Sequence, residues 1–146
     1  MAGQAVPSPR QRQVQLDSTT IRAHQHAAGP RKKGLQALER SRGGFSTKLF
    51  GAGNGAGGLL AFTLTAGQAG DAPQAADLPG PLLAPARQGL ADTAYDSDAL
   101  RAQIAQTDAV AVVPPRPNRL QPPHLDPLTY RDRNPVERLI NRLKQF

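Results

Sequence analysis

The sequence predicts a mixed α/β fold, and the order of two kinds of hydrophobic pattern is the reason. Segments that alternate apolar and polar residues, as strands do, dominate the first half of the 146-residue chain. Segments with apolar residues three or four positions apart, as on one face of a helix, dominate the second half. The resulting order is strand, hairpin, helix, strand, helix, strand, linker and helix. Three strands that can pair antiparallel, followed by strands joined through helices, are typical of a mixed sheet.

The first half is expected to supply three neighbouring strands. Residues 1–12 are polar, contain prolines and show no periodicity, so they are interpreted as a disordered lead-in. Residues 14–21 alternate apolar and polar side chains and predict the first strand. Residues 45–50 and 59–65 predict a hairpin, and the glycine-rich residues 51–58 between them are expected to be its flexible tip, with almost nothing to pack.

The second half alternates helices with short strands. Its predicted elements are a helix over residues 71–78, a short buried strand within 88–95, a helix over 98–106 that Ser97 caps, and a strand over 109–113. Residues 114–127 contain six prolines and predict an extended basic linker.

The best-marked helix lies at the end of the sequence. Asn134 can cap it, Pro135 stands at the first helical position, and Glu137 follows three residues after the cap, as in a capping box. The apolar residues recur at helical spacing and form one stripe for the core: Val136, Leu139, Ile140, Leu143 and Phe146.

The composition limits the classes of protein that this chain can be. It has no cysteine, which excludes disulfides, thiolate metal sites and cysteine nucleophiles. No apolar run approaches about eighteen residues and no signal-peptide pattern follows Met1, so a soluble intracellular protein without membrane contact is expected. The few large apolar residues and the absence of tryptophan predict a thin core.

Basic flanks surround an acidic centre. Residues 1–48, 49–115 and 116–146 carry net charges of +7, −4 and +4, which together give the formal net charge of +7. This distribution suits a polyanion gripped from both sides of a carboxylate site, and solvated surface charge explains it equally. Lys32 and Lys33 share this ambiguity between nonspecific DNA contacts and solvated charges.

Three acidic residues stand on separate predicted elements: Asp17 on the first strand, Asp92 after the short strand, and Glu137 on the terminal helix. Cleavage and transfer of phosphodiesters need an activated nucleophilic oxygen and a stabilised leaving oxygen, and two divalent ions held by carboxylates supply both. Oxygen ligands of this kind favour Mg²⁺ or Mn²⁺. Ordinary roles compete, since Glu137 can be only a capping residue and Asp17 only a turn residue.

The spacing of Tyr130, Arg133, Glu137 and Lys144, Y-x2-R-x3-E-x6-K, resembles the signature of insertion-sequence DDE transposases of the insertion sequence four and five groups. Other segments are similar to further blocks of that family in the same order: Leu16–Thr19 with Ile21–Gly29, Ser41–Lys48, Leu64–Asp71 and Leu90–Ser97. The resemblance spans about residues 14–146.

The resemblance implies an RNase H-like, retroviral-integrase-like fold and a catalytic, metal-binding triad of Asp17, Asp92 and Glu137 with two Mg²⁺ or Mn²⁺ ions. Such a site cuts a DNA strand at the element's end with water and then joins the freed 3′-hydroxyl to target DNA. The expected partners are transposon inverted-repeat ends and target DNA, with a homo-oligomer in the active complex and a bacterial cytoplasmic, nucleoid-associated location. The residues expected to contact DNA are Tyr130, Arg133, Lys144, Arg138, Lys48 and Arg42.

Several alternatives stay open. Asp96 competes with Asp92 for the second acid, and Asp92 is preferred because the end of the strand should present the ligand. His24 and His26 could chelate a metal, but without a third ligand nearby they are interpreted as polar loop residues. No Lys-Ser/Thr pair follows residues 51–58, so they are not interpreted as a phosphate-binding loop.

Residues 13–146 are therefore interpreted as one partial catalytic domain. It is expected to lack the family's upstream DNA-binding segment and to be truncated at its C-terminus, either as a second reading frame joined by frameshifting or as a truncated copy. Two alternatives to an active transposase are a decayed, non-catalytic remnant with residual nonspecific DNA binding and an RNase H-like nuclease without strand transfer. The residues around Glu137 disfavour the nuclease because they imply ordered handling of a DNA end.

Overall fold

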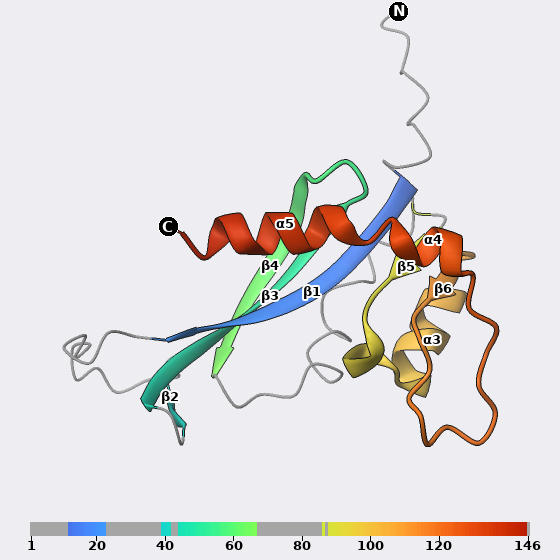
Figure 1. The fold of residues 1–146 in the computed structure, drawn as a ribbon, viewed down its shortest axis with the longest axis horizontal. Coiled ribbons are helices and arrows are strands. Elements are labelled where there is room, and N and C mark those ends of the chain that lie inside the picture. Colours follow the sequence, from blue (N-terminus) through green and yellow to red (C-terminus); the bar gives the residue numbers. More distant parts are fainter. Residues whose placement is uncertain (1–11, 23–38, 42–43, 67–85, 87, 146) are drawn as a thin grey trace, which may run out of the picture.

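A mixed sheet organises the part of the chain that the computed structural model describes, residues 12–22, 39–41, 44–66, 86 and 88–145 (Figure 1). Its strands are β1 (Gln13–Arg22), β2 (Glu39–Ser41), β3 (Gly44–Asn54), β4 (Leu59–Ala66), β5 (Gln88–Leu90) and β6 (Val110–Val112). Within the described residues they form a six-stranded sheet in the order β2-β3-β1-β5-β6, with β4 also paired to β3. The pairs of β3 with β1, β2 and β4 are antiparallel, and β1-β5 and β5-β6 are parallel. The predicted mixed α/β class is confirmed.

Helices pack on both faces of this sheet. They are α3 (Asp98–Ala105), α4 (Pro127–Arg131) and α5 (Asn134–Leu143), and a short 3₁₀ helix, η2 (Thr93–Tyr95), follows β5. Successive residues of a strand point to opposite faces, and β3 shows the division. Phe50 belongs to the cluster that includes Leu100 and Ile104 of α3, whereas its neighbour Leu49 packs with Val136 and Ile140 of α5. The larger core therefore lies on the α3 face, and α5 crosses β1 and β3 on the other (Figure 1).

Several predicted elements are confirmed. The first strand, the outer hairpin strand and the strand within 109–113 are present as β1, β4 and β6. Ser97 caps α3 by accepting a hydrogen bond from the backbone N–H of Leu100, and Leu100 and Ile104 of that helix are buried. The proline-rich segment has no regular structure until Pro127, where α4 begins.

The predicted flexible hairpin tip is wrong over its first half. Residues 51–54 belong to β3, and only residues 55–58 form the turn. The glycines were interpreted as residues without packing partners, yet Gly51 and Gly53 lie directly beneath α5. A Cβ atom on Gly51 would lie 2.7 Å from Cδ1 of Ile140, and one on Gly53 would lie 3.0 Å from Cδ2 of Leu139. Glycine here permits close approach of a helix to a strand.

The predicted cap of the terminal helix is also wrong. Asn134 is already helical, and Arg133 before it has helical angles and makes no side-chain capping hydrogen bond. A preceding helix, α4, explains the difference. It is capped by Asp126 with Pro127 in its first turn, and a single turn leads from it into α5. Glu137 therefore completes no capping box with Asn134.

Two further differences concern short elements. Residues 39–41 were placed outside any strand and form β2, which pairs with residues 44–46. The strand expected within residues 88–95 ends at Leu90, and η2 follows it. The lead-in over residues 1–11, the helix predicted over 71–78, both loop histidines, Lys32, Lys33, Arg42 and Phe146 lie outside the described residues. None of the described helices is long and apolar enough to cross a membrane.

Candidate active site

Strand pairing brings the first two predicted acids together. Asp17 lies on β1, on the same face as Gly51 and therefore beneath α5. The parallel register of β1 with β5 sets Gln15 beside Leu90, so Asp17 and Asp92, each two residues further along, continue side by side. Asp92 is fixed there because its Oδ1 accepts a hydrogen bond from the backbone N–H of Ala94 at 2.8 Å and so caps η2.

Gln15 positions the third predicted acid by attaching the start of α5 to β1. Its Nε2 donates a hydrogen bond to the carbonyl of Asp132 at 2.8 Å, and its Oε1 accepts one from the backbone N–H of Val136 at 3.2 Å. This fully buried side chain binds a carbonyl at the C-terminal end of α4 and an N–H in the first turn of α5, which also donates to the carbonyl of Arg133 at 3.2 Å. The first turn of α5, which carries Glu137, is thereby held over the strand that carries Asp17.

All three acids converge on one guanidinium group, that of Arg133. Its Nη2 lies 3.1 Å from Oδ1 of Asp17 and 3.7 Å from Oδ2 of Asp92, and its Nη1 lies 3.1 Å from Oε1 of Glu137. The Arg133 side chain is only 10% exposed, whereas those of Asp92 and Glu137 are 38% and 51% exposed. The site is thus a half-open acidic cluster with one buried cation among its members.

Burial and charge shift the ionisation of this cluster. Burial raises the pKa of Asp17, the charge of Arg133 opposes that rise, and the negative charges of Asp92 and Glu137 add to it. Burial lowers the pKa of Arg133, but Asp17 and the other surrounding acids outweigh it, so that pKa is raised and the side chain stays cationic. The charge of Arg133 therefore favours the ionised form of the Asp17 carboxyl.

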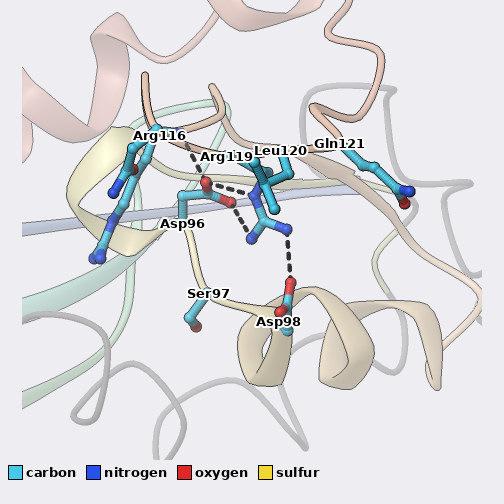
Figure 2. A pocket seen from close by; sticks show the side chains of 8 residues that line it. Asp96, Ser97, Asp98, Arg116, Arg119, Leu120 and Gln121 are labelled. Atoms are coloured by element: carbon cyan, nitrogen blue, oxygen red, sulfur yellow. Dashed lines mark hydrogen bonds and ion pairs between the residues drawn. The ribbon is translucent and has the colours of Figure 1, made fainter.

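Asp96, the competitor of Asp92, is engaged elsewhere (Figure 2). Its side chain is fully buried and accepts hydrogen bonds from Arg101 Nε at 2.7 Å, from the backbone N–H of Arg116 at 2.8 Å and from Arg119 Nε at 3.0 Å. Burial alone would raise the pKa of Asp96, but the hydrogen bonds from Arg119, Arg116 and Arg101 lower it to about 2. This carboxylate ties the segment after β6 to the start of α3, and a groove of about 680 Å³ lies beside it.

The acidic cluster has the ligand chemistry of a Mg²⁺ or Mn²⁺ site. Three carboxylates on a strand, on a strand end and on a helix are the oxygen donors that these ions prefer. Among the described residues, however, no three acids or histidines lie close enough together to hold an ion as they stand. The guanidinium of Arg133 separates the carboxylates, and its buried Nε has no hydrogen-bond partner within the described part of the chain. By their chemistry, these three carboxylates are a donor set that suits a divalent cation.

The residues expected to contact DNA are less tightly grouped. Tyr130 lies half-buried on α4, and Lys144 lies exposed at the C-terminal end of α5. Arg138 lies on another side of α5, in a groove of about 600 Å³ beside the hairpin turn. Lys48 is on the sheet face opposite Asp17, with its ammonium 5.3 Å from the centre of the Phe50 ring. Arg42 lies outside the described residues.

Sequence reasoning missed Gln15 and the role of Arg133 toward the acids. A signal for Gln15 was present, because Gln13, Gln15 and Asp17 place polar side chains on one face of a predicted strand. A polar face on an otherwise buried strand indicates a site or a buried hydrogen-bond network. Nothing in the local sequence indicated which groups they meet, since Asp132 and Val136 lie more than a hundred positions away.

Comparisons with known proteins agree on a family. The family model described as "Transposase DDE domain" matches residues 8–146. A protein of Brucella ovis that is named as a transposase for insertion sequence element IS6501 is 36% identical over 102 residues, which cover 69% of this chain and 78% of that protein. No solved structure matches the chain.

Proposed function

Because the chain belongs to the DDE transposase family, we propose that Asp17, Asp92 and Glu137 are its catalytic acids for cutting and joining DNA at insertion-sequence ends. The observation that carries the proposal is their convergence on the Arg133 guanidinium at 3.1, 3.7 and 3.1 Å. The side chain of Asp96, by contrast, is fully buried among other arginines and unavailable to a substrate.

The three acids would hold two Mg²⁺ or Mn²⁺ ions, which supply an activated nucleophilic oxygen and a stabilised leaving oxygen. Asp17 is rigidly placed on β1, and Asp92 is fixed by its hydrogen bond to Ala94. Glu137 is the most exposed of the three acids. In the proposed reaction, water cuts the strand at the element's end, and the freed 3′-hydroxyl then attacks a phosphodiester of the target DNA.

Tyr130, Arg133 and Lys144 are proposed to contact phosphates beside the acids, as the Y-R-E-K pattern of the insertion sequence four and five groups implies. A planar arginine fork binds a phosphate through two parallel hydrogen bonds, and lysine acts as a point charge. Arg138, Lys48 and Arg42 are proposed to bind flanking DNA. An RNase H-like fold is supported by the order of antiparallel β4, β3 and β1 followed by parallel β5 and β6.

The proposed setting is bacterial DNA in the cytoplasm, with inverted-repeat ends and target DNA as substrates and a homo-oligomer in the active complex. A DNA-binding segment from an upstream reading frame is proposed as a further partner.

The test uses the full chain with Mg²⁺ and a supercoiled plasmid that carries the DNA flanking this gene on both sides. We expect Mg²⁺-dependent nicking at the element's ends, abolished by Asp17→Asn, Asp92→Asn or Glu137→Gln. Asp108→Asn is the matched control, because Asp108 is exposed in the turn between α3 and β6 and asparagine tolerates its positive φ of 58°. Nicking that survives all three substitutions would remove the triad assignment.

A further inference from the structure

We infer that Arg133 is an exchangeable internal counterion, which occupies the place among the three acids that a divalent cation needs and leaves it when the cation binds. The inference rests on the proposed function and adds a competition between this chain's own arginine and the metal. On this inference, Arg133 positions the three acids while no metal is bound. It becomes a phosphate ligand only after the metal has displaced it from the acids.

The position of the guanidinium is the first argument. One planar group reaches carboxylates from three separate elements, with Nη2 between Asp17 and Asp92 and Nη1 on Glu137. Three carboxylates this close repel one another unless a cation stands among them. Arg133 therefore holds the acids together when no metal is present, and metal and arginine cannot both occupy the centre of the cluster.

Incomplete bonding of Arg133 is the second argument. Its contact with Asp92 is 3.7 Å long, beyond hydrogen-bond length, and its buried Nε has no partner among the described atoms. Arg119 shows what a fixed arginine looks like in the same chain. It donates to Asp96 at 3.0 and 3.1 Å and to Asp98 at 2.7 Å, and so uses its whole fork. Arg133 is held more loosely than Arg119.

Access from solvent is the third argument. Glu137 and Asp92 are 51% and 38% exposed, so an ion can reach two of the three carboxylates without unfolding the site. Arg133 lies at the junction between α4 and α5, where its backbone N–H donates to the carbonyl of Tyr130 at 3.2 Å and its own carbonyl accepts from the N–H of Val136 at 3.2 Å. A side chain at this junction can turn outward while Gln15 keeps the start of α5 in place.

Mn²⁺ binding measured by electron paramagnetic resonance and calorimetry tests the exchange without any catalytic readout. Arg133→Gln should bind Mn²⁺ at least about tenfold more tightly than the wild type. The metal no longer has to displace Arg133, and the free energy of one charge-assisted hydrogen bond corresponds to a factor of about ten in affinity. The same variant should melt at a lower temperature without metal and gain more in melting temperature when Mn²⁺ is added. Arg133→Lys keeps the charge but loses the fork, so its Mn²⁺ affinity should lie between the two.

Arg142→Gln is the matched control, since it removes the same charge from another side of α5, where Arg142 donates a hydrogen bond to the hairpin-turn carbonyl of Gly57 at 3.5 Å. Its Mn²⁺ affinity should equal that of the wild type. In the wild type, the Nε–H signal of Arg133 in nuclear magnetic resonance spectra should shift on addition of diamagnetic Mg²⁺ while that of Arg101 stays. This readout needs no variant and holds if Arg133→Gln does not fold.

Two outcomes would overturn the inference while leaving the proposed function intact. One is equal or weaker Mn²⁺ binding by folded Arg133→Gln, and the other is an Arg133 signal that Mg²⁺ does not move although the protein binds it. A third outcome is that neither the wild type nor any variant binds Mn²⁺ in a way that Glu137→Gln abolishes. That result would contradict both the proposed metal-dependent function and the exchange.

Discussion

Gln15 and Val136, on β1 and in the first turn of α5, are joined by a 3.2 Å hydrogen bond from the backbone N–H of Val136 to the side-chain Oε1 of Gln15. The same amide group donates to the carbonyl of Asp132 at 2.8 Å. Since Arg133 makes no capping hydrogen bond, this strand side chain takes the place of a local helix cap. It sets the distance between Asp17, two residues further along β1, and the helix that carries Glu137.

Replacing this amide should destabilise the fold and misplace the helix. Gln15→Leu removes the partner of the Asp132 carbonyl and leaves the N–H of Val136 with its 3.2 Å hydrogen bond to the carbonyl of Arg133, which should lower the free energy of unfolding by about 2 kcal/mol. Urea unfolding measures the loss. Gln121→Leu is the control, because Gln121 is exposed in the proline-rich segment and should change stability by less than about 0.5 kcal/mol. Equal stability of wild type and Gln15→Leu would refute the capping role.

Close approach of α5 to β3 should depend on Gly51. A Cβ there meets Cδ1 of Ile140 at 2.7 Å, so Gly51→Ala should cost roughly 1 kcal/mol of stability through overpacking. Ile140→Val removes that carbon atom, and the double variant should recover part of the loss caused by Gly51→Ala. Independent, additive effects in a double-mutant cycle measured by urea unfolding would show that the two residues do not contact each other.

Asp96 should matter for stability and its acid dependence. The unfolded carboxyl takes up its proton near the ordinary pKa of 3.8, whereas the folded one does so only at about 2. Its contribution to stability is therefore complete above pH 4 or so and is lost as the pH falls toward 2. Asp96→Asn should lower the free energy of unfolding at pH 7 by about 2 kcal/mol and flatten its fall below pH 4.

Measurements of Mn²⁺ affinity show whether Asp92 or Asp96 is the second metal-binding acid. Asp96→Asn, if folded, should bind Mn²⁺ as the wild type does, and Asp92→Asn should bind it more weakly. The reverse pattern would make Asp96 the second acid.

The groove between α5 and the hairpin turn should contribute to DNA affinity. Arg138 and Arg142 both line it, and each phosphate contact that is removed lowers the slope of log K against log salt by about 1. Arg138→Gln should therefore weaken binding to any duplex DNA and reduce this slope by about 1. Arg22→Gln, at the exposed end of β1, is the control for loss of one positive charge. An unchanged slope in Arg138→Gln would exclude a phosphate contact by Arg138.

Elements with strong local patterns could be predicted from the sequence. Alternation in residues 14–21 and the Ser97 cap depend on neighbours within a few positions, and β1 and α3 follow them. The start of α5 was misjudged because Asn134 and Pro135 look like a cap in isolation, whereas α4 precedes them and Gln15 supplies the hydrogen bond. The glycines of residues 51–54 were misjudged for a related reason, since their partner, α5, follows far along the chain.

The candidate site was likewise predictable only in part. Residue types and spacing pointed to Asp17, Asp92 and Glu137, but only the parallel register of β1 with β5 explains why Asp92 rather than Asp96 stands next to Asp17. The ion pair of Arg133 with Asp17 joins residues 116 positions apart, and no local pattern encodes it.

Anomalous X-ray scattering from crystals grown with Mn²⁺ would test the central claim most directly. We predict manganese peaks bounded by the carboxylates of Asp17, Asp92 and Glu137, with the Arg133 guanidinium moved out of the cluster. Manganese bound at Asp96, or an active protein whose three acids remain closed around Arg133 without a metal, would contradict it.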